Sequence, residues 1–165
     1  LVGGRSVMQN KPQRALATPS KERLRLWLRL LKTTRSIEAT VRERLREEFG
    51  TTLPRFDVMA ALSRYEEGLK MSQLSTVLRV SNGNVTGIVD RLAEDGFLVR
   101  VPVPGDRRAS MVRLTKRGLQ EFERQACEHE DWIGAMLQDF TAEEAADFGT
   151  RLETLEASLP IRRGT

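Results

Sequence analysis

The sequence predicts a mainly α-helical protein with one small β-hairpin. Three observations support this fold class. First, apolar residues recur at helical spacing along a long segment at each end of the chain. Second, the two shorter helical segments between these ends are separated by only three residues. Third, two runs of β-branched residues flank a Pro-Gly-Asp turn. The length of 165 residues suits one domain with a buried core, or a core with one appendage.

Residues 1–17 show no periodicity and are expected to form a flexible arm. The first helix is predicted to follow them, over residues 18–49. Thr18 and Pro19 suit its first turn, and Gly50 suits its end. This helix has two apolar faces, and such a helix usually buries one face and offers the other to a partner. One face consists of Leu24, Trp27, Leu28, Leu31, Ile37, Val41 and Leu45, and the other of Leu26 and Leu30.

Residues 50–118 are predicted to form one compact module. Its expected elements are helices over 54–64, 72–78 and 82–95 and strands over 97–103 and 109–114. The second and third helices are joined by the turn 79–81, which gives the pair the proportions of a helix-turn-helix. Ser72 is the expected cap of the first helix of this pair, and Gly96 is expected to end the second.

Two further helices are predicted after the hairpin. Thr115 caps one that continues to about residue 138, and Thr141 with Glu144 forms a capping box for the last. Four apolar residues at 4-3-4 spacing give the last helix the seam of a helix that packs on another helix: Phe148, Leu152, Leu155 and Leu159. We therefore predict that residues 18–49 and 119–159 together form a helical dimerisation region.

Charge is distributed unevenly along the chain. The net charge is +4, but residues 1–46 hold 12 Lys or Arg against 3 Asp or Glu, a net +9, whereas residues 119–159 hold 2 against 11, a net −9. Opposite charges at the two ends can attract each other within one subunit or between subunits. They can also leave a basic face for a polyanion.

Composition excludes several classes of protein and site. No apolar run approaches the roughly 20 residues that a membrane span requires, and residues 1–9 lack the apolar core of a signal peptide, so we expect a cytoplasmic protein without a membrane partner. The single cysteine excludes an internal disulfide and a multi-thiolate zinc site, and the single histidine excludes a histidine cluster. We expect no metal, no cofactor and no catalytic residue.

The helix predicted over 82–95 has an unusual outer face. On a helical wheel its buried stripe consists of Val85, Ile88, Val89, Leu92 and Ala93. The opposite face consists of Gly83, Asn84, Thr86, Gly87, Asp90 and Arg91. A glycine inside a helix costs roughly 1 kcal/mol relative to alanine, and it removes side-chain bulk where another surface comes close. The alternative is that the glycines allow tight packing within the protein.

This outer face suits duplex DNA. Short Asn and Thr side chains can reach base edges, and a helix N-terminus favours a phosphate. We therefore predict that residues 82–91 enter a major groove. The predicted contacts are Asn82, Asn84 and Thr86 at base edges or adjacent phosphates, Arg91 at a phosphate or a guanine, and Ser81 and Gly87 on the same surface.

The hairpin tip carries the second signal for DNA. Arg107 and Arg108 place two guanidinium groups on a tight turn, which suits a DNA backbone or the negative potential of a minor groove. Asp106 is expected to accept a hydrogen bond from Arg108 and to orient that side chain. The alternative is a solvated charged turn.

The run from Met71 to Leu98, followed by Gly-Asp-Arg-Arg-Ala-Ser-Met-Val-Arg-Leu-Thr-Lys-Arg-Gly over 105–118, resembles the core of the MarR family of winged helix-turn-helix regulators. The most specific part is Asp-Arg-Arg with Leu-Thr beginning six residues after its last arginine. The similarity is strongest over 53–118 and, with the flanking helices, covers 18–159. It implies an obligate homodimer that binds a palindromic operator, usually as a repressor released by a small ligand. It also implies that Arg108 reaches the minor groove and that Asp106 orients it.

The resemblance further implies an effector pocket where the first, second and fifth helices meet. The candidates are Trp27, Leu31 and Arg35 on the first helix, Phe56, Met59 and Arg64 on the second, and His129 and Trp132 on the fifth. Aromatic walls with one cation suit a planar aromatic acid. Residues 53–61 and 81–89 are also similar to the subgroup that governs hydroxycinnamate breakdown and responds to aromatic acyl-CoA thioesters, whose phosphates would need cations such as Arg23, Arg25, Arg29 and Lys32. The alternative is that these aromatic and Met side chains are ordinary core.

Three other functions were weighed. A redox-sensing repressor of the same fold would use Cys127, but its acidic neighbours disfavour the thiolate. An enzyme would use His129 with Glu128, Glu130 and Asp131, but neighbouring residues on a helix point in different directions and no other catalytic motif accompanies them. A dimeric scaffold without DNA binding is the third, and footprinting separates it from a regulator.

Overall fold

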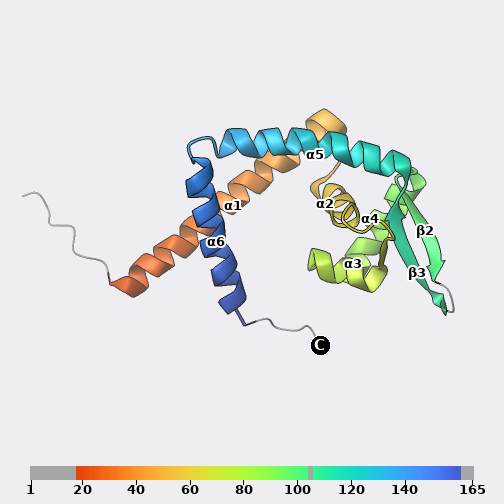
Figure 1. Cartoon of the computed structure of the whole chain (residues 1–165), viewed down its shortest axis with the longest axis horizontal. Helices are drawn as coiled ribbons and strands as arrows, with labels where there is room; N and C mark the ends of the chain where they lie inside the picture. Colours follow the sequence, from red (N-terminus) through yellow and green to blue (C-terminus); the bar gives the residue numbers. More distant parts are fainter. Residues whose placement is uncertain (1–17, 104–105, 161–165) are drawn as a thin grey trace, which may run out of the picture. The chain divides into compact units, whose positions relative to one another are not determined.

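The computed structural model describes residues 18–103 and 106–160, and it confirms the predicted fold class: helices with a small antiparallel sheet (Figure 1). The elements in chain order are α1 Pro19–Phe49, α2 Leu53–Leu62, β1 Leu69–Lys70, α3 Met71–Leu78, α4 Asn82–Glu94, β2 Leu98–Val103, β3 Asp106–Leu114, α5 Lys116–Met136 and α6 Ala142–Ser158. Within these described ranges, no helix is both long enough and apolar enough to cross a membrane. The predicted arm, residues 1–17, lies outside the described residues.

The chain divides into two compact units, Leu1–Ala39 and Thr40–Thr165. The described part of the first unit is the beginning of α1, where Leu24, Trp27 and Leu28 are exposed. The end of α1 belongs to the second unit, where Val41 and Leu45 are buried. The apolar stripe predicted along this helix is thus buried only toward its C-terminus.

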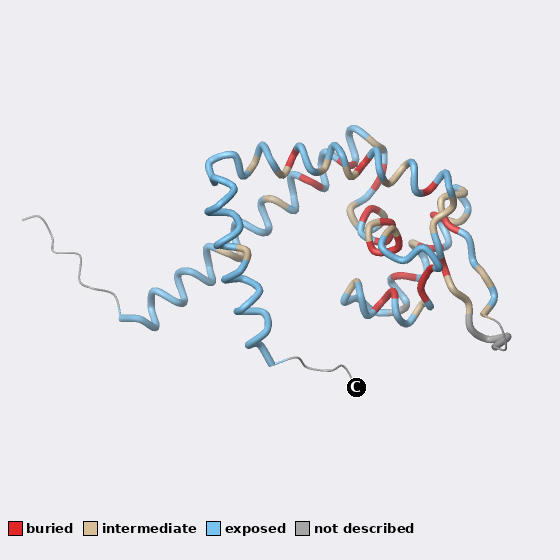
Figure 2. Tube along the Cα trace, in the orientation of Figure 1, coloured by how far each residue is buried: buried red, intermediate tan, exposed pale blue. Residues whose placement is uncertain are grey.

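The core lies in the second unit, where α2, α3 and α4 pack beside the sheet (Figures 1 and 2). Its buried side chains are Val58, Met59, Ala61, Leu62, Leu69, Leu74, Val85, Val89, Leu92, Leu98 and Val112. Each helix contributes its apolar stripe and leaves its polar face outside, as the spacing predicts. Because α4 is held by three side chains with no exposed area, Val85, Val89 and Leu92, its outer face has a defined orientation.

The sheet has three antiparallel strands in the order β1-β3-β2. β2 and β3 form the predicted hairpin, with Leu98 opposite Leu114 and a register shift between Pro102 and Val103. β1 pairs with β3 through Leu69 and Val112. β1 was not predicted, because two residues are too few to show a strand period.

Hydrogen bonds at the helix ends confirm most of the predicted caps. The Thr115 hydroxyl donates to the Gly96 carbonyl at 2.7 Å and accepts from the Gly118 amide at 3.0 Å. Thr141 and Glu144 form the predicted capping box. The predicted cap at Ser72 is wrong: α3 starts one residue earlier, and its N-cap is Lys70, whose backbone amide donates to Gln73 Oε1 at 2.9 Å. The side-chain oxygen of Gln73 thus accepts the backbone N–H at the start of the helix, and no hydroxyl group caps it.

Candidate nucleic-acid interface

α3 and α4 are joined by a turn in which Arg79 adopts the left-handed conformation, with φ +55°. The amides of Arg79 and Val80 donate to Thr76 and Ser75 carbonyls at 3.2 and 3.1 Å, so the end of α3 is satisfied within the turn. A non-glycine residue in this region is uncommon, and here the surrounding helices determine it. The turn is therefore as tight as the residue count predicts.

The start of α4 follows directly. Ser81 is its N-cap, with φ −68° and ψ 147°, and its hydroxyl makes no capping hydrogen bond to the helix. Its carbonyl accepts from the Asn84 amide at 3.1 Å. The first-turn amides of a helix without a side-chain cap can donate to an anion such as a phosphate.

The burial of α4 confirms the two faces of the helical wheel. Val85, Val89 and Leu92 are fully buried. The residues of the opposite face are exposed: Gly83, Asn84, Thr86, Gly87, Asp90 and Arg91. Of the remaining predicted contacts, Ser81 is exposed, and the side chain of Asn82 is outside the described residues.

Both outward glycines face open space. A Cβ atom built on Gly83 or on Gly87 meets no described atom within 4 Å. Packing against the described residues therefore does not require either glycine, and the alternative of tight packing within the protein finds no support among them. The room that they leave is available to another molecule.

The hairpin extends from the same module. The predicted start of its second strand at residue 109 is wrong: β3 begins at Asp106, so Asp106, Arg107 and Arg108 belong to the first residues of the strand and not to the turn. The structure does not describe the side chains of these three residues or the turn 104–105. The predicted hydrogen bond between Asp106 and Arg108 therefore lies outside the described residues. The strand that carries these residues is anchored in the core by Val112, which is fully buried.

Three of the predicted effector residues, Phe56 of α2 and His129 and Trp132 of α5, come together in the second unit. Together with two further residues they form an aromatic cluster, consisting of Phe49, Phe56, Phe122, His129 and Trp132. The Phe56 ring lies 4.9 Å from the His129 ring and 5.7 Å from that of Phe122. The guanidinium of Arg44 lies 5.7 Å from the Trp132 ring centroid. Of the other candidates in this unit, Met59 belongs to the core and Arg64 is exposed.

Gln125 lies on the face of α5 that carries Phe122, His129 and Trp132, and sequence reasoning missed it. It is only 2% exposed, and it stands three residues after Phe122 and four before His129, on the same face of α5. Its Nε2 donates to Glu121 Oε1 at 2.8 Å, whereas its buried Oε1 has no hydrogen-bond partner among the described residues. A glutamine on the apolar face of a helix is the sequence signal that could have found it. Burial raises the pKa of Glu121, but hydrogen bonds from Arg124 and Gln125 outweigh burial and hold that pKa below its usual value.

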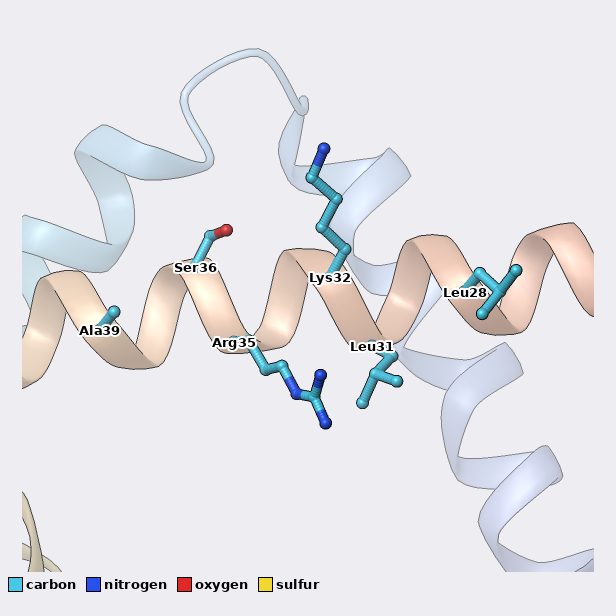
Figure 3. A pocket seen from close by; sticks show the side chains of 6 residues that line it. All are labelled: Leu28, Leu31, Lys32, Arg35, Ser36 and Ala39. Carbon is cyan, nitrogen blue, oxygen red and sulfur yellow. The ribbon is translucent and has the colours of Figure 1, made fainter.

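The candidates on the first part of α1 belong to the first unit. Leu31 and Arg35 line a groove along this helix together with Leu28, Lys32, Ser36 and Ala39 (Figure 3). Arg23, Arg25, Trp27 and Arg29 are exposed, and Arg25 pairs with Glu22 at 2.5 Å. This stretch of helix thus combines apolar and cationic side chains on its surface.

Comparison with known proteins gives the family. A model of the MarR family matches residues 49–109, the segment from the end of α1 to the beginning of β3. The HTH-type transcriptional regulator PecS of Dickeya dadantii is 32% identical over 110 residues, covering 66% of each chain. The activatory protein BadR of Rhodopseudomonas palustris is 34% identical over 101 residues, covering 60% of this chain and 57% of its own. The chain belongs to the MarR family of winged-helix transcriptional regulators.

Solved MarR structures agree with this assignment. A MarR family regulator from Silicibacter pomeroyi is 29% identical, with a TM-score of 0.71 over 87% of this chain and 99% of its own. A mutant of E. coli MarR in complex with operator DNA, 24% identical, shares the fold with a TM-score of 0.72 over 87% of this chain and all of its own. This MarR chain spans two thirds or less of the length of the curated relatives named above.

Two further groups of residues were candidates in the sequence: the cysteine and the acidic side chains. Cys127 is exposed on α5, and in the part of the chain that the structure describes no three His, Cys, Asp or Glu side chains are grouped so that they could hold a metal ion. The relatives named above are all regulators.

We expect stability to fall below about pH 6.5 because of His129. Burial lowers the pKa of His129, so the folded state favours the neutral ring, whereas the unfolded chain takes up a proton near pH 6.5. The unfolded state therefore binds more protons below that pH, and this contribution to stability is present above pH 6.5 and lost as the pH falls toward the lower folded-state pKa. The melting temperature between pH 7.5 and 5.5 should fall more in wild type than in His129→Phe. Equal slopes would contradict this assignment.

Proposed function

We propose that this MarR chain is a homodimeric, ligand-responsive repressor that binds a palindromic operator. In this proposal α4 lies in the major groove and the tip of the β2–β3 hairpin in the adjacent minor groove. The observation that carries the proposal is the outer face of α4. That helix is anchored by fully buried side chains, yet its exposed face holds two glycines with open space around them. An E. coli MarR mutant of the same fold is described in complex with operator DNA, which supports operator DNA as the partner.

Exposed apolar side chains support the homodimer. They gather on two helices whose polar residues have opposite charge, α1 in the basic segment and α6 in the acidic one. On α1 they are Leu24, Leu26, Trp27 and Leu28, and on α6 Phe148, Leu152 and Leu155. Apolar faces of this kind mark interaction sites, and twofold symmetry would place two copies of α4 about 34–36 Å apart, one turn of DNA.

We propose a planar aromatic effector, an aromatic acid or its CoA thioester. The aromatic cluster supports this, and Gln125 Oε1 on the same face of α5 is a buried acceptor with no hydrogen-bond partner among the described residues. It would accept a hydrogen bond from a phenolic hydroxyl. An effector that binds better to a dimer whose α4 helices are wrongly spaced shifts the population away from DNA binding.

Selection from randomised duplexes tests the function. The wild-type chain should enrich one palindromic sequence, protect it in footprinting, and sediment as a dimer. No enriched sequence, or protection without sequence preference, would favour the scaffold. Titration calorimetry with p-coumaric acid, p-coumaroyl-CoA and free CoA then tests the effector. Binding that dissociates the operator complex supports the proposal, whereas a complex that survives both aromatic ligands overturns the effector assignment alone.

Two substitutions should separate sequence reading from backbone contact. Asn84→Ala should relax the preference at one base position of each half-site, by about 1–3 kcal/mol, because a side chain at a base edge is lost. Arg108→Ala should weaken binding to all sequences alike and reduce the slope of log K against log salt concentration by about 1. Anisotropy titrations over a salt series measure both. Wild-type behaviour of both variants would show that the groove assignment is wrong.

A further inference from the structure

Asp90 is out of place on a surface for DNA. It lies on the exposed face of α4, on the turn that follows Gly87, where a bound duplex would bring phosphates close. A carboxylate at such a position repels phosphates, so its presence on the proposed interface requires a physical reason.

The structure gives Asp90 a partner in the hairpin. Arg100 Nη2 of β2 lies 2.5 Å from Asp90 Oδ1. Arg100 stands opposite Val112, and Leu98 comes two residues before it on the same face of the sheet. Val112 and Leu98 are buried in the core, so the Arg100 side chain lies on the core-facing side of β2. At the edge of the core it reaches Asp90 of α4.

The geometry leaves part of the guanidinium for a second acceptor. The Arg100 side chain keeps 36% of its area exposed and that of Asp90 keeps 51%, so the pair lies at the solvent edge between helix and hairpin. A guanidinium has five N–H donors in a fixed planar fork, and among the described residues the one recorded acceptor is Asp90 Oδ1, which binds Nη2. A carboxylate bound to one edge of the fork holds the remaining donors in one direction.

We propose that Arg100 binds a backbone phosphate beside the groove that α4 occupies, and that Asp90 is a positioning residue that orients this guanidinium. The inference rests on the proposed function, because it assumes that α4 faces DNA. It extends the interface from the helix and the hairpin tip to the stem of the hairpin. It also explains the carboxylate, which is compensated by Arg100 and serves to aim it.

The proposal and plain electrostatics predict opposite signs for Asp90→Asn. Removing a negative charge from a DNA-binding face should tighten binding if only charge matters. We expect Asp90→Asn instead to weaken binding about five- to tenfold, because the Arg100 guanidinium loses its orientation. Glu94→Gln is the matched control: it removes the same charge one turn later on α4, where the structure shows no ion pair for Glu94 among the described residues. This control should bind as tightly as wild type or more tightly.

Two further measurements separate positioning from a structural role. Arg100→Ala should reduce the slope of log K against log salt concentration by about 0.9, the loss of one phosphate contact, and Asp90→Asn should weaken binding no further in that background. A purely structural pair would lower the melting temperature and leave the salt slope unchanged. Arg100→Lys, which keeps the charge without the fork, should recover part of the slope.

The outcomes also distinguish this inference from the proposed function. If wild type and Glu94→Gln bind the selected palindrome while Asp90→Asn binds equally well or better, or if Arg100→Ala keeps the full salt slope, the inference is overturned and the proposed function stands. If wild type selects no duplex, the proposed function itself fails.

Discussion

Replacing Gly83 and Gly87 together by alanine will make the protein more stable and lower its affinity for DNA. Gly87 lies in the interior of α4, where alanine is favoured by roughly 1 kcal/mol, and Gly83 lies in its first turn, where the preference is smaller; at neither position does the added Cβ meet a described atom within 4 Å. The double variant should therefore gain about 1–2 kcal/mol, a rise in melting temperature of about 2–8 °C. The same two methyl groups stand on the face proposed to approach the bases, so affinity for the selected operator should fall about tenfold or more.

Gly134→Ala is the control for this prediction. Gly134 is also helical, in α5, and its Cβ position is also open, but it lies outside the proposed interface. This variant should gain roughly 1 kcal/mol of stability and keep wild-type affinity. Thermal unfolding and anisotropy titration measure the two effects separately. A double variant at 83 and 87 that gains stability and binds as well as wild type would show that α4 does not approach DNA closely.

Gly118→Ala should have the opposite effect on stability, although the substitution is the same. A Cβ at Gly118 would lie 2.0 Å from the Phe97 carbonyl oxygen, a backbone atom that cannot rotate away. That carbonyl also accepts the Thr115 amide at 2.9 Å, so relieving the clash must move the start of α5 away from the residue that precedes β2. We expect a loss of about 3 kcal/mol or more, and a melting temperature lower by about 6–12 °C.

Helix propensity alone predicts a gain for Gly118→Ala, so the sign of the measured change decides between propensity and packing. Gly134→Ala again serves as the matched control, since it carries the propensity gain without the clash. Chemical denaturation of the two variants side by side gives both free energies. Stabilisation of Gly118→Ala would mean that α5 does not begin as closely against Phe97 as described.

The faces of α4 could be predicted because they depend on helical periodicity alone. Val85, Val89 and Leu92 repeat at the spacing of one helix face, and the structure buries all three completely. The turn at Arg79, the end of α1 at Gly50 and the capping box at Thr141 could be predicted for the same reason, since each depends on residues within one turn of each other.

Contacts between residues far apart in the chain could not be predicted in this way. β1 exists only because Leu69 meets Val112 in the sheet. Gln125 is buried on the face of α5 whose aromatic rings meet rings of α1 and α2, and its Oε1 has no partner among the described residues. Asp90 looks like a solvated charge on a helical wheel, and only the register of β2 with β3 places Arg100 beside it.

By itself, the sequence determined the helices, the tight turn, the hairpin and the outward face of α4, because local propensity, capping and hydrophobic period are written in neighbouring residues. The tertiary structure alone decided what surrounds each of them: that Gly83 and Gly87 face open space while Gly118 has no room for a methyl group, and that a carboxylate on α4 holds an arginine of the hairpin. The physical reason is that free volume and ion pairing depend on which distant segments the core brings together. The periodicity of a single segment does not indicate which distant residues will lie next to it.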